Sequence, residues 1–124
     1  MSIRDLYTEE EVREIQKLLK TTVKGKAYSI LYYFLRWLLA QRRLVFTQFE
    51  FWRWCRKFTD VSYSKIENWL DMLTKYKMLK RIRIGIYRVE NAALLTFGFV
   101  DLADLLGVSY DSSFITKTSE KKEE

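Results

Sequence analysis

Apolar residues recur at intervals of three and four along much of the chain, the spacing at which side chains share one face of a helix. Four such stretches precede residue 75, and they predict helices over residues 9–20, 27–43, 48–58 and 61–73. The second has the broadest apolar face, so we expect it to be the central helix. A further short helix is expected near residues 100–106.

The starts of three of these helices have recognisable capping residues. Thr8 with Glu11, and Thr47 with Glu50, have the Thr-x-x-Glu spacing of a capping box, in which each partner satisfies a backbone N–H of the first turn. Ser62 is a plausible N-cap for the fourth helix. The short segment before Thr47 is expected to be extended.

The fourth helix divides cleanly into two faces. Its buried stripe is predicted to be Ile66, Trp69, Leu70 and Leu73. The outward face then comprises Tyr63, Ser64, Lys65, Asn68 and Asp71. In the third helix, Phe51, Cys55 and Phe58 share one face, whereas Phe49 points nearly the opposite way.

The stretch MLKRIRIGIYRVE, residues 78–90, places four basic residues among β-forming residues around Gly85. With Ile84 and Gly85 as the loop, residue 82 would pair with 87 and residue 81 with 88. That register places Ile82, Tyr87 and Val89 on one face. It places Arg81, Arg83 and Arg88 on the other. A longer loop with a left-handed Gly85 would mix the two sets.

Charge is uneven along the 124 residues. Residues 1–20 sum to −1, residues 21–90 to +10 and residues 91–124 to −3, which together give the net charge of +6. The hydrophobic content of 48% is enough for one globular core. We therefore expect a single domain whose middle part meets an anionic partner.

The sequence offers little for catalysis or metal binding. It has no His and one Cys, Cys55, too few soft ligands for a structural zinc site. Asp101 and Asp104 are the compact carboxylate pair of the acidic segment, with no nucleophile or phosphate loop beside them. We expect neither an enzyme nor a cofactor.

The most apolar stretch, residues 28–40, is shorter than the roughly 20 residues of a bilayer span and contains Arg36. No secretory signal is visible, so we expect an intracellular, cytoplasmic protein without a membrane partner. Few Asn and Gln and many charges are typical of thermophile proteins, whereas the absence of Pro is not.

The order helix, short strand, helix, turn, helix and basic hairpin over residues 27–90 resembles a winged helix-turn-helix domain. FTQFEFWRWCRKF corresponds to the family's second helix, VSYSKIENWLDML to its recognition helix and KYKMLKRIRIGIYRV to the link into its wing. Lys77 stands where that link commonly has Gly, and the wing is very short.

The resemblance implies a mainly α fold with a small β-hairpin, extended at both ends. The expected divisions are an N-terminal helix and candidate dimerisation element (1–22), the winged helix-turn-helix core (23–90), a C-terminal extension (91–114) and a disordered tail (115–124). A homodimer would form through the N-terminal helix or the segment after the wing.

The resemblance also implies binding to double-stranded DNA by a small transcriptional regulator. Ser64, Lys65 and Asn68 would face the major groove, with Tyr63 and Ser64 near a phosphate. Lys80, Arg81, Arg83 and Arg88 would contact the flanking backbone. Arg42 and Arg43, which also suit the end of a helix dipole, complete the candidate DNA contacts.

Several alternatives remain open at this stage. The outward helix face could simply be solvated, and the basic hairpin could be a charged edge that prevents aggregation. The domain could be a protein-interaction module within a transcription or replication complex, or bind RNA. Packing is the default role of Phe49, Trp52, Trp54 and Trp37, with base stacking as the alternative.

Overall fold

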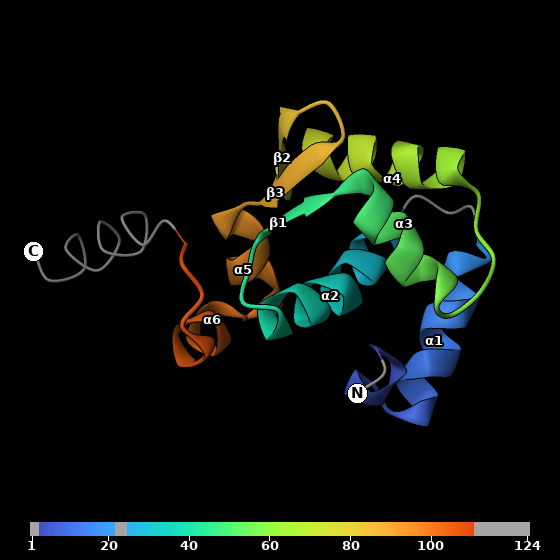
Figure 1. Cartoon of the computed structure of the whole chain (residues 1–124), viewed down its shortest axis with the longest axis horizontal. Helices are drawn as coiled ribbons and strands as arrows, with labels where there is room; N and C mark the ends of the chain where they lie inside the picture. Colours follow the sequence, from blue (N-terminus) through green and yellow to red (C-terminus); the bar gives the residue numbers. More distant parts are fainter. Residues whose placement is uncertain (1–2, 22–24, 111–124) are drawn as a thin grey trace, which may run out of the picture.

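The computed structural model describes residues 3–21 and 25–110, and it shows a mainly helical chain with a small antiparallel sheet (Figure 1). The elements run in the order η1 (Ile3–Leu6), α1 (Glu9–Leu19), α2 (Gly25–Ala40), β1 (Val45–Thr47), α3 (Gln48–Arg56), α4 (Tyr63–Lys75), β2 (Leu79–Arg83), β3 (Ile86–Val89), α5 (Asn91–Phe97) and α6 (Val100–Leu106). The mainly α fold class with a small hairpin is thereby confirmed.

Helix α2 forms the centre of the domain, as its broad apolar face predicts. Ile30, Phe34, Leu35 and Leu38 are fully buried. The helix ends at Ala40, earlier than expected, because the backbone turns left-handed at Arg42 (φ 59°). The predicted third helix likewise ends slightly early.

Helix α1 packs along α2. Its predicted stripe of Val12, Ile15, Leu18 and Leu19 is buried within the chain itself. The stripe is therefore not available for a second copy, which removes the basis for expecting a dimer through the N-terminal helix.

The predicted caps are present. Thr8 N donates to Glu11 Oε1 at 3.0 Å and Glu11 N donates back to Thr8 Oγ1 at 3.1 Å. Thr47 and Glu50 form the same pair of bonds at 3.1 and 3.0 Å. Each box satisfies backbone donors that the first turn of a helix leaves free.

The sheet contains three strands in the order β1-β3-β2. The predicted extended segment before Thr47 joins the hairpin as an edge strand, with Phe46 opposite Tyr87. Their rings stack at 6.0 Å over the core side of the sheet. Gln48 N, at the start of α3, donates to Gly85 O at 2.9 Å, so the hairpin turn lies against the first turn of α3.

The C-terminal extension contains one helix that the sequence analysis predicted and one that it missed. Helix α6 occupies the expected residues, whereas α5 was not foreseen. Phe97 and Phe99 lie 5.6 and 5.3 Å from the Tyr32 ring and so attach the extension to α2. The predicted tail over 115–124 lies outside the described residues.

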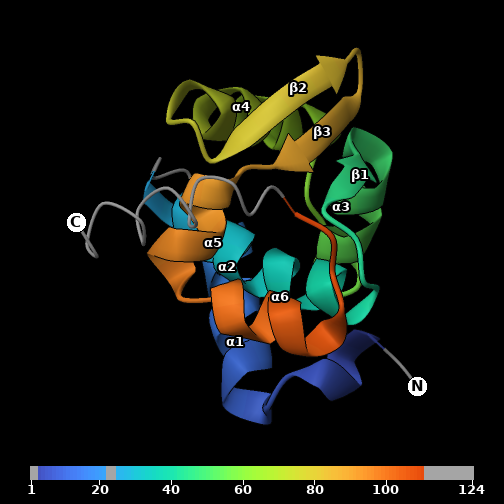
Figure 2. The same ribbon diagram turned by 90° about the vertical axis from the view of Figure 1, so that its left-hand side faces the viewer.

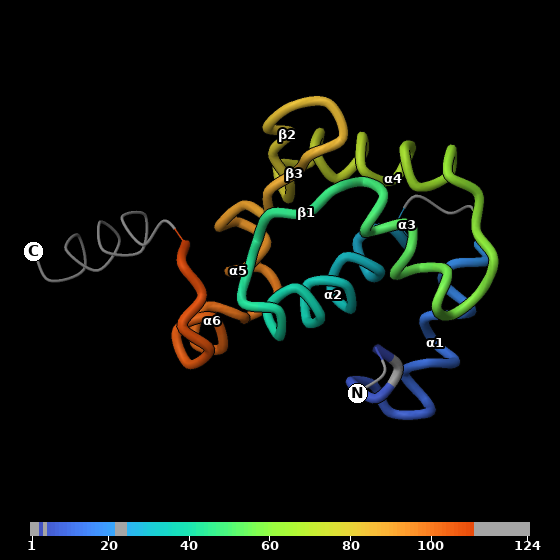
Figure 3. The backbone as a smooth tube through the Cα atoms, in the orientation of Figure 1, coloured from blue at the N-terminus to red at the C-terminus, as the bar shows by residue number. Residues whose placement is uncertain are grey.

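The arrangement leaves the outer side of α4 uncovered by the described C-terminal residues. Figure 2 shows α4 and the β2–β3 hairpin together at one end of the molecule, with α6 at the other. The backbone trace in Figure 3 follows the chain from α3 through a short connection into α4 and then into the hairpin. Helix α4 and the hairpin are therefore neighbours on one surface.

Candidate nucleic-acid interface

Helix α4 presents a polar face to solvent because its apolar residues are packed inward. Ser62 Oγ accepts a hydrogen bond from Lys65 N at 3.2 Å and fixes the start of the helix. The predicted stripe of Ile66, Trp69, Leu70 and Leu73 is buried. Ser64 and Asn68 are exposed and Tyr63 is 39% exposed, so the outward orientation predicted for these three is confirmed.

Lys65 does not belong to this outward face, and the prediction was wrong for it. Its Nζ donates to the carbonyl oxygen of Leu19 at 2.6 Å and lies 5.1 Å from the Trp69 ring centroid. The ammonium thus closes the C-terminal end of α1, where a cation suits both the helix dipole and an unpaired carbonyl. Burial lowers the pKa of Lys65.

The hairpin register also differs from the prediction. Leu79 pairs with Val89, Lys80 with Arg88, Arg81 with Tyr87 and Arg83 with Ile86. The shift between Arg81 and Arg83 leaves Ile82 as an extra residue, a β-bulge. Gly85 takes the left-handed conformation with φ 75°, as the competing loop required.

The bulge changes which cations share a face. Arg81 lies on the side of the buried Tyr87 and Val89, because residues directly opposite in a ladder point the same way. Lys80, Arg83 and Arg88 are on the other side. The prediction that all three arginines share one face is therefore wrong: they surround the hairpin and do not line one side of it.

Most of the hairpin charge is not neutralised. Lys80, Arg81 and Arg83 are exposed, and they form no ion pair with any residue that the structure describes. Arg88 is the exception, since its Nη2 lies 3.6 Å from Glu90 Oε2. Three side chains on four successive positions, 80–83, thus present positive charge to solvent.

Charged side chains of both signs lie near Tyr87 of β3. Burial raises the pKa of Tyr87; Arg81 opposes this shift, while Asp71 and Glu67 add to it. Both carboxylates are exposed on α4. An anion approaching the outer face of α4 therefore meets two negative side chains, with Arg81 of the hairpin close to them.

Arg42 and Arg43 follow the C-terminal end of α2, and Arg43 Nη1 donates to the carbonyl oxygen of Val45 on β1 at 3.1 Å. Arg43 is ion-paired with Glu50 and its guanidinium lies 5.4 Å from the Trp37 ring centroid. Val45 lies opposite Arg88 in the sheet, so Arg43 lies on the β1 side of the hairpin, with its charge already paired.

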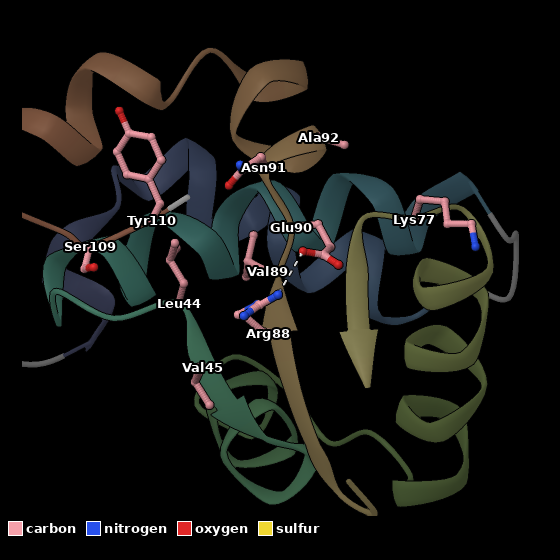
Figure 4. Close-up of a pocket in the computed structure, with 10 residues that line it drawn as sticks. All are labelled: Leu44, Val45, Lys77, Arg88, Val89, Glu90, Asn91, Ala92, Ser109 and Tyr110. Carbon is pink, nitrogen blue, oxygen red and sulfur yellow. Dashed lines mark ion pairs between the residues drawn. The ribbon is translucent and has the colours of Figure 1, made fainter. Parts of the chain in front are cut away.

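A cleft that the sequence gave no reason to expect lies beside the sheet. It is lined by Val45, Arg88, Glu90 and Tyr110, among others (Figure 4). The Arg88–Glu90 ion pair forms part of its wall. Tyr110 is turned toward α6, where its hydroxyl donates to Asp104 at 2.7 Å. Asp104 therefore has a local partner.

The aromatic residues of α3 differ in how much of each side chain is exposed to solvent. Trp54 is buried as the packing interpretation predicts, but Phe49 is 51% exposed. Sequence reasoning had placed Phe49 opposite the buried face of α3, which is the signal that could have identified it. Cys55 is buried in the core, and burial raises its pKa.

Comparison of the chain with family models, with curated proteins and with solved structures gives no match. Among residues 3–21 and 25–110, no helix has both the length and the apolar character that a bilayer span requires. In the same residues, no three His, Cys, Asp or Glu side chains gather to hold a metal ion.

Proposed function

We propose that this protein is a winged helix-turn-helix protein that binds double-stranded DNA in a sequence-specific manner and regulates transcription. The observation that carries the proposal is the exposed, unpaired charge of Lys80, Arg81 and Arg83 beside α4. Phosphate contacts supply much of the affinity of DNA-binding proteins, and a short exposed strand bearing several free cations is suited to the DNA backbone.

In this proposal α3, α4 and the hairpin are the second helix, the recognition helix and the wing. Asn68 is the candidate base reader, because an amide side chain pairs well with adenine in the major groove. Ser64 and Tyr63 at the helix start would contact a phosphate. Lys65 is withdrawn from this set, since its ammonium is held by α1.

Glu67 and Asp71 limit how deeply α4 can enter a groove of the DNA. Two carboxylates on the outer face of α4 would repel phosphates on either side of a groove, so the helix would enter shallowly by its N-terminal half. The hairpin cations would then provide most of the attraction. With about four phosphates neutralised, the logarithm of the affinity should fall with the logarithm of salt concentration at a slope of about −3.6.

The direct test is the double variant Arg81→Ala with Arg83→Ala. Binding to duplexes of any sequence should weaken, and the salt slope should become shallower by about 2 units. The matched control is Arg13→Ala with Lys17→Ala, which removes two exposed charges from α1. Equal weakening by both pairs in fluorescence anisotropy titrations would show that net charge, and not this hairpin, attracts the DNA.

Sequence specificity is tested separately. Asn68→Ala should cost about 1–3 kcal/mol of discrimination between the preferred site and random DNA, while binding to random DNA changes little. The preferred site would first be obtained by selection from random duplexes. A selection that yields no preferred sequence would restrict the proposal to non-specific binding.

A second candidate function is a protein-interaction module of a transcription or replication complex. Ile84 at the hairpin tip is 86% exposed and Leu105 on α6 is 82% exposed, and exposed aliphatic side chains can dock on a partner protein. A homodimer through the segment after the hairpin would use Leu105. Binding that persists from low to high salt would favour this function, because apolar contacts are not screened. RNA binding shares the electrostatics and is tested by competition with an RNA duplex.

A further inference from the structure

Three aromatic side chains form an exposed row between α3 and α4. The row consists of Phe49, Trp52 and Tyr63. The ring centroids of Phe49 and Trp52 are 5.6 Å apart, and those of Trp52 and Tyr63 are 5.5 Å apart. Phe49 is 51% exposed, Tyr63 is 39% exposed and Trp52 is half-buried between them.

Secondary structure holds this aromatic row in place. Phe49 and Trp52 are one turn apart on α3, and Tyr63 is the first residue of α4, next to the N-cap Ser62. Trp52 Nε1 donates to the carbonyl oxygen of Val61 at 2.9 Å, which fixes the central ring to the connection between the two helices. A preformed surface of this kind loses little conformational entropy when it binds a flat ligand.

Guanidinium groups border the row. Arg53 lies 5.9 Å from the Phe49 ring centroid and Arg56 lies 5.0 Å from that of Trp52. Arg53 forms no ion pair with the residues that the structure describes, while Arg56 has Asp60 at 3.4 Å. The row begins one residue after Gln48, whose N–H holds the hairpin turn, so it adjoins the basic hairpin.

We propose that the aromatic row binds unpaired bases of a DNA strand that continues from the duplex held by α4 and the hairpin. This inference rests on the proposed function, and it narrows the substrate to DNA in which a duplex adjoins a single-stranded segment. Bases stack on exposed aromatic rings irrespective of sequence, and neighbouring arginines attract the phosphates between them. A nucleic acid fits this surface better than an apolar protein face, because an apolar partner would bury the Arg53 guanidinium, which has no ion-pair partner among the described residues.

The test compares three labelled DNAs by fluorescence anisotropy at one salt concentration. They are a blunt duplex, the same duplex with a tail of about ten thymidines, and the same tailed duplex with abasic sites in place of the thymidines. The wild-type protein should bind the tailed duplex about 25-fold more tightly than the blunt duplex, about fivefold for each of two stacked bases. The abasic tail, which keeps the phosphates but has no bases, should lose most of that gain.

Phe49→Leu is the decisive variant, since it keeps an apolar side chain at an exposed position and removes the ring. It should reduce the preference for the tailed duplex by about fivefold or more per stacked base and leave affinity for the blunt duplex unchanged. Phe49→Leu combined with Tyr63→Leu should abolish the preference. Tyr76→Leu, which removes a ring that is 57% exposed at the far end of α4, is the control and should change nothing.

Two DNA-binding results and one assembly result would overturn the inference. One is equal affinity for blunt and tailed duplexes, and the other is a preference that survives loss of both Phe49 and Tyr63. If sedimentation velocity shows a dimer that Phe49→Leu dissociates, a second copy of the chain occupies the row and the inference is also wrong. Failure of the proposed function is separate, because it would appear as blunt-duplex binding that does not respond to Arg81→Ala with Arg83→Ala.

Discussion

Arg36 and the hairpin arginines are the same residue type in opposite surroundings. Arg36 forms an ion pair with Glu11 of α1, and its side chain is only 26% exposed. Its guanidinium lies 5.2, 5.8 and 6.0 Å from the ring centroids of Tyr7, Tyr32 and Tyr33. Arg81 and Arg83 are exposed and have no ion-pair partner among the described residues.

The difference is that one arginine is used inside the fold and the others remain available to a partner. Although burial alone would lower the pKa of Arg36, Glu11 holds it above the ordinary value, and this ion pair joins α1 to α2. Arg81 and Arg83 form no ion pair within the described residues. Their charge is directed to solvent, where it is available to a polyanion.

The largest expected effect comes from removing Arg36. Arg36→Leu should lower the free energy of unfolding by about 2 kcal/mol, below the range for a fully buried pair because Glu11 is partly solvated. Urea unfolding measures the loss. Arg83→Leu is the control and should stay within about 0.5 kcal/mol of wild type. If both variants lost a similar free energy of unfolding, Arg36 would contribute no more to stability than the hairpin arginines do.

Part of the stabilisation from the Arg36–Glu11 ion pair should be lost at acid pH. Arg36 holds the pKa of Glu11 below its ordinary value of 4.5, so the native state favours the carboxylate. The stabilisation is complete above the ordinary pKa and is lost as the pH falls through the lowered native pKa.

Urea unfolding between neutral pH and about pH 3 should therefore show a shallower pH dependence in Arg36→Leu than in wild type. Glu50, whose pKa Arg43 also lowers, supplies a residual dependence. Arg81→Ala with Arg83→Ala should follow the wild-type curve, because neither side chain is paired with Glu11 or Glu50. If the free energy of unfolding of the hairpin variant also became less dependent on pH, the pH dependence could not be assigned to Glu11 and Glu50.

The link from α4 into the hairpin provides a third test, which concerns the backbone. Lys77 has φ 66°, and Met78 N donates to Leu73 O at 3.0 Å in a left-handed helix end. Lys77→Gly should raise the free energy of unfolding by about 0.5–1 kcal/mol, because glycine accepts this conformation without a steric penalty. Lys80→Gly, in a strand, should lower it by a similar amount. The same sign for both would refute the interpretation.

The smallest expected effect concerns the hairpin charges themselves. Lys80 lies directly opposite Arg88 in the ladder, and like charges in that position disfavour pairing. Lys80→Thr should therefore raise the free energy of unfolding by a few tenths of a kcal/mol while weakening DNA binding. Thr96→Ser, an exposed position on α5, serves as the control. Lower stability in Lys80→Thr would mean that the charge contributes to the fold.

The elements that the sequence predicted best are those with local signals. Thr8 with Glu11, Thr47 with Glu50, and Ser62 mark helix starts through bonds that span three residues, so adjacent sequence is sufficient to specify them. Helices α5 and α6 are both seven residues long and neither has a side-chain capping bond, so no local signal marks where they begin, and only α6 was predicted.

The candidate site was predicted less completely, since its geometry depends on distant contacts. Lys65 reaches Leu19 across 46 positions of the chain, which no local pattern indicates. The bulge at Ile82 depends on how the whole sheet packs, and it reversed the facing of Arg81. The exposure of Phe49 followed from helical angle alone, but its alignment with Tyr63 required α3 and α4 to be placed in space.

The amino-acid sequence by itself determined where the helices begin, which faces they bury and that the basic residues concentrate in the middle of the chain. These properties arise from hydrogen bonds and side-chain periodicity within a few turns. The tertiary structure alone decided which cations are paired and which remain free, because pairing depends on groups that are far apart in sequence and meet only when the core has packed.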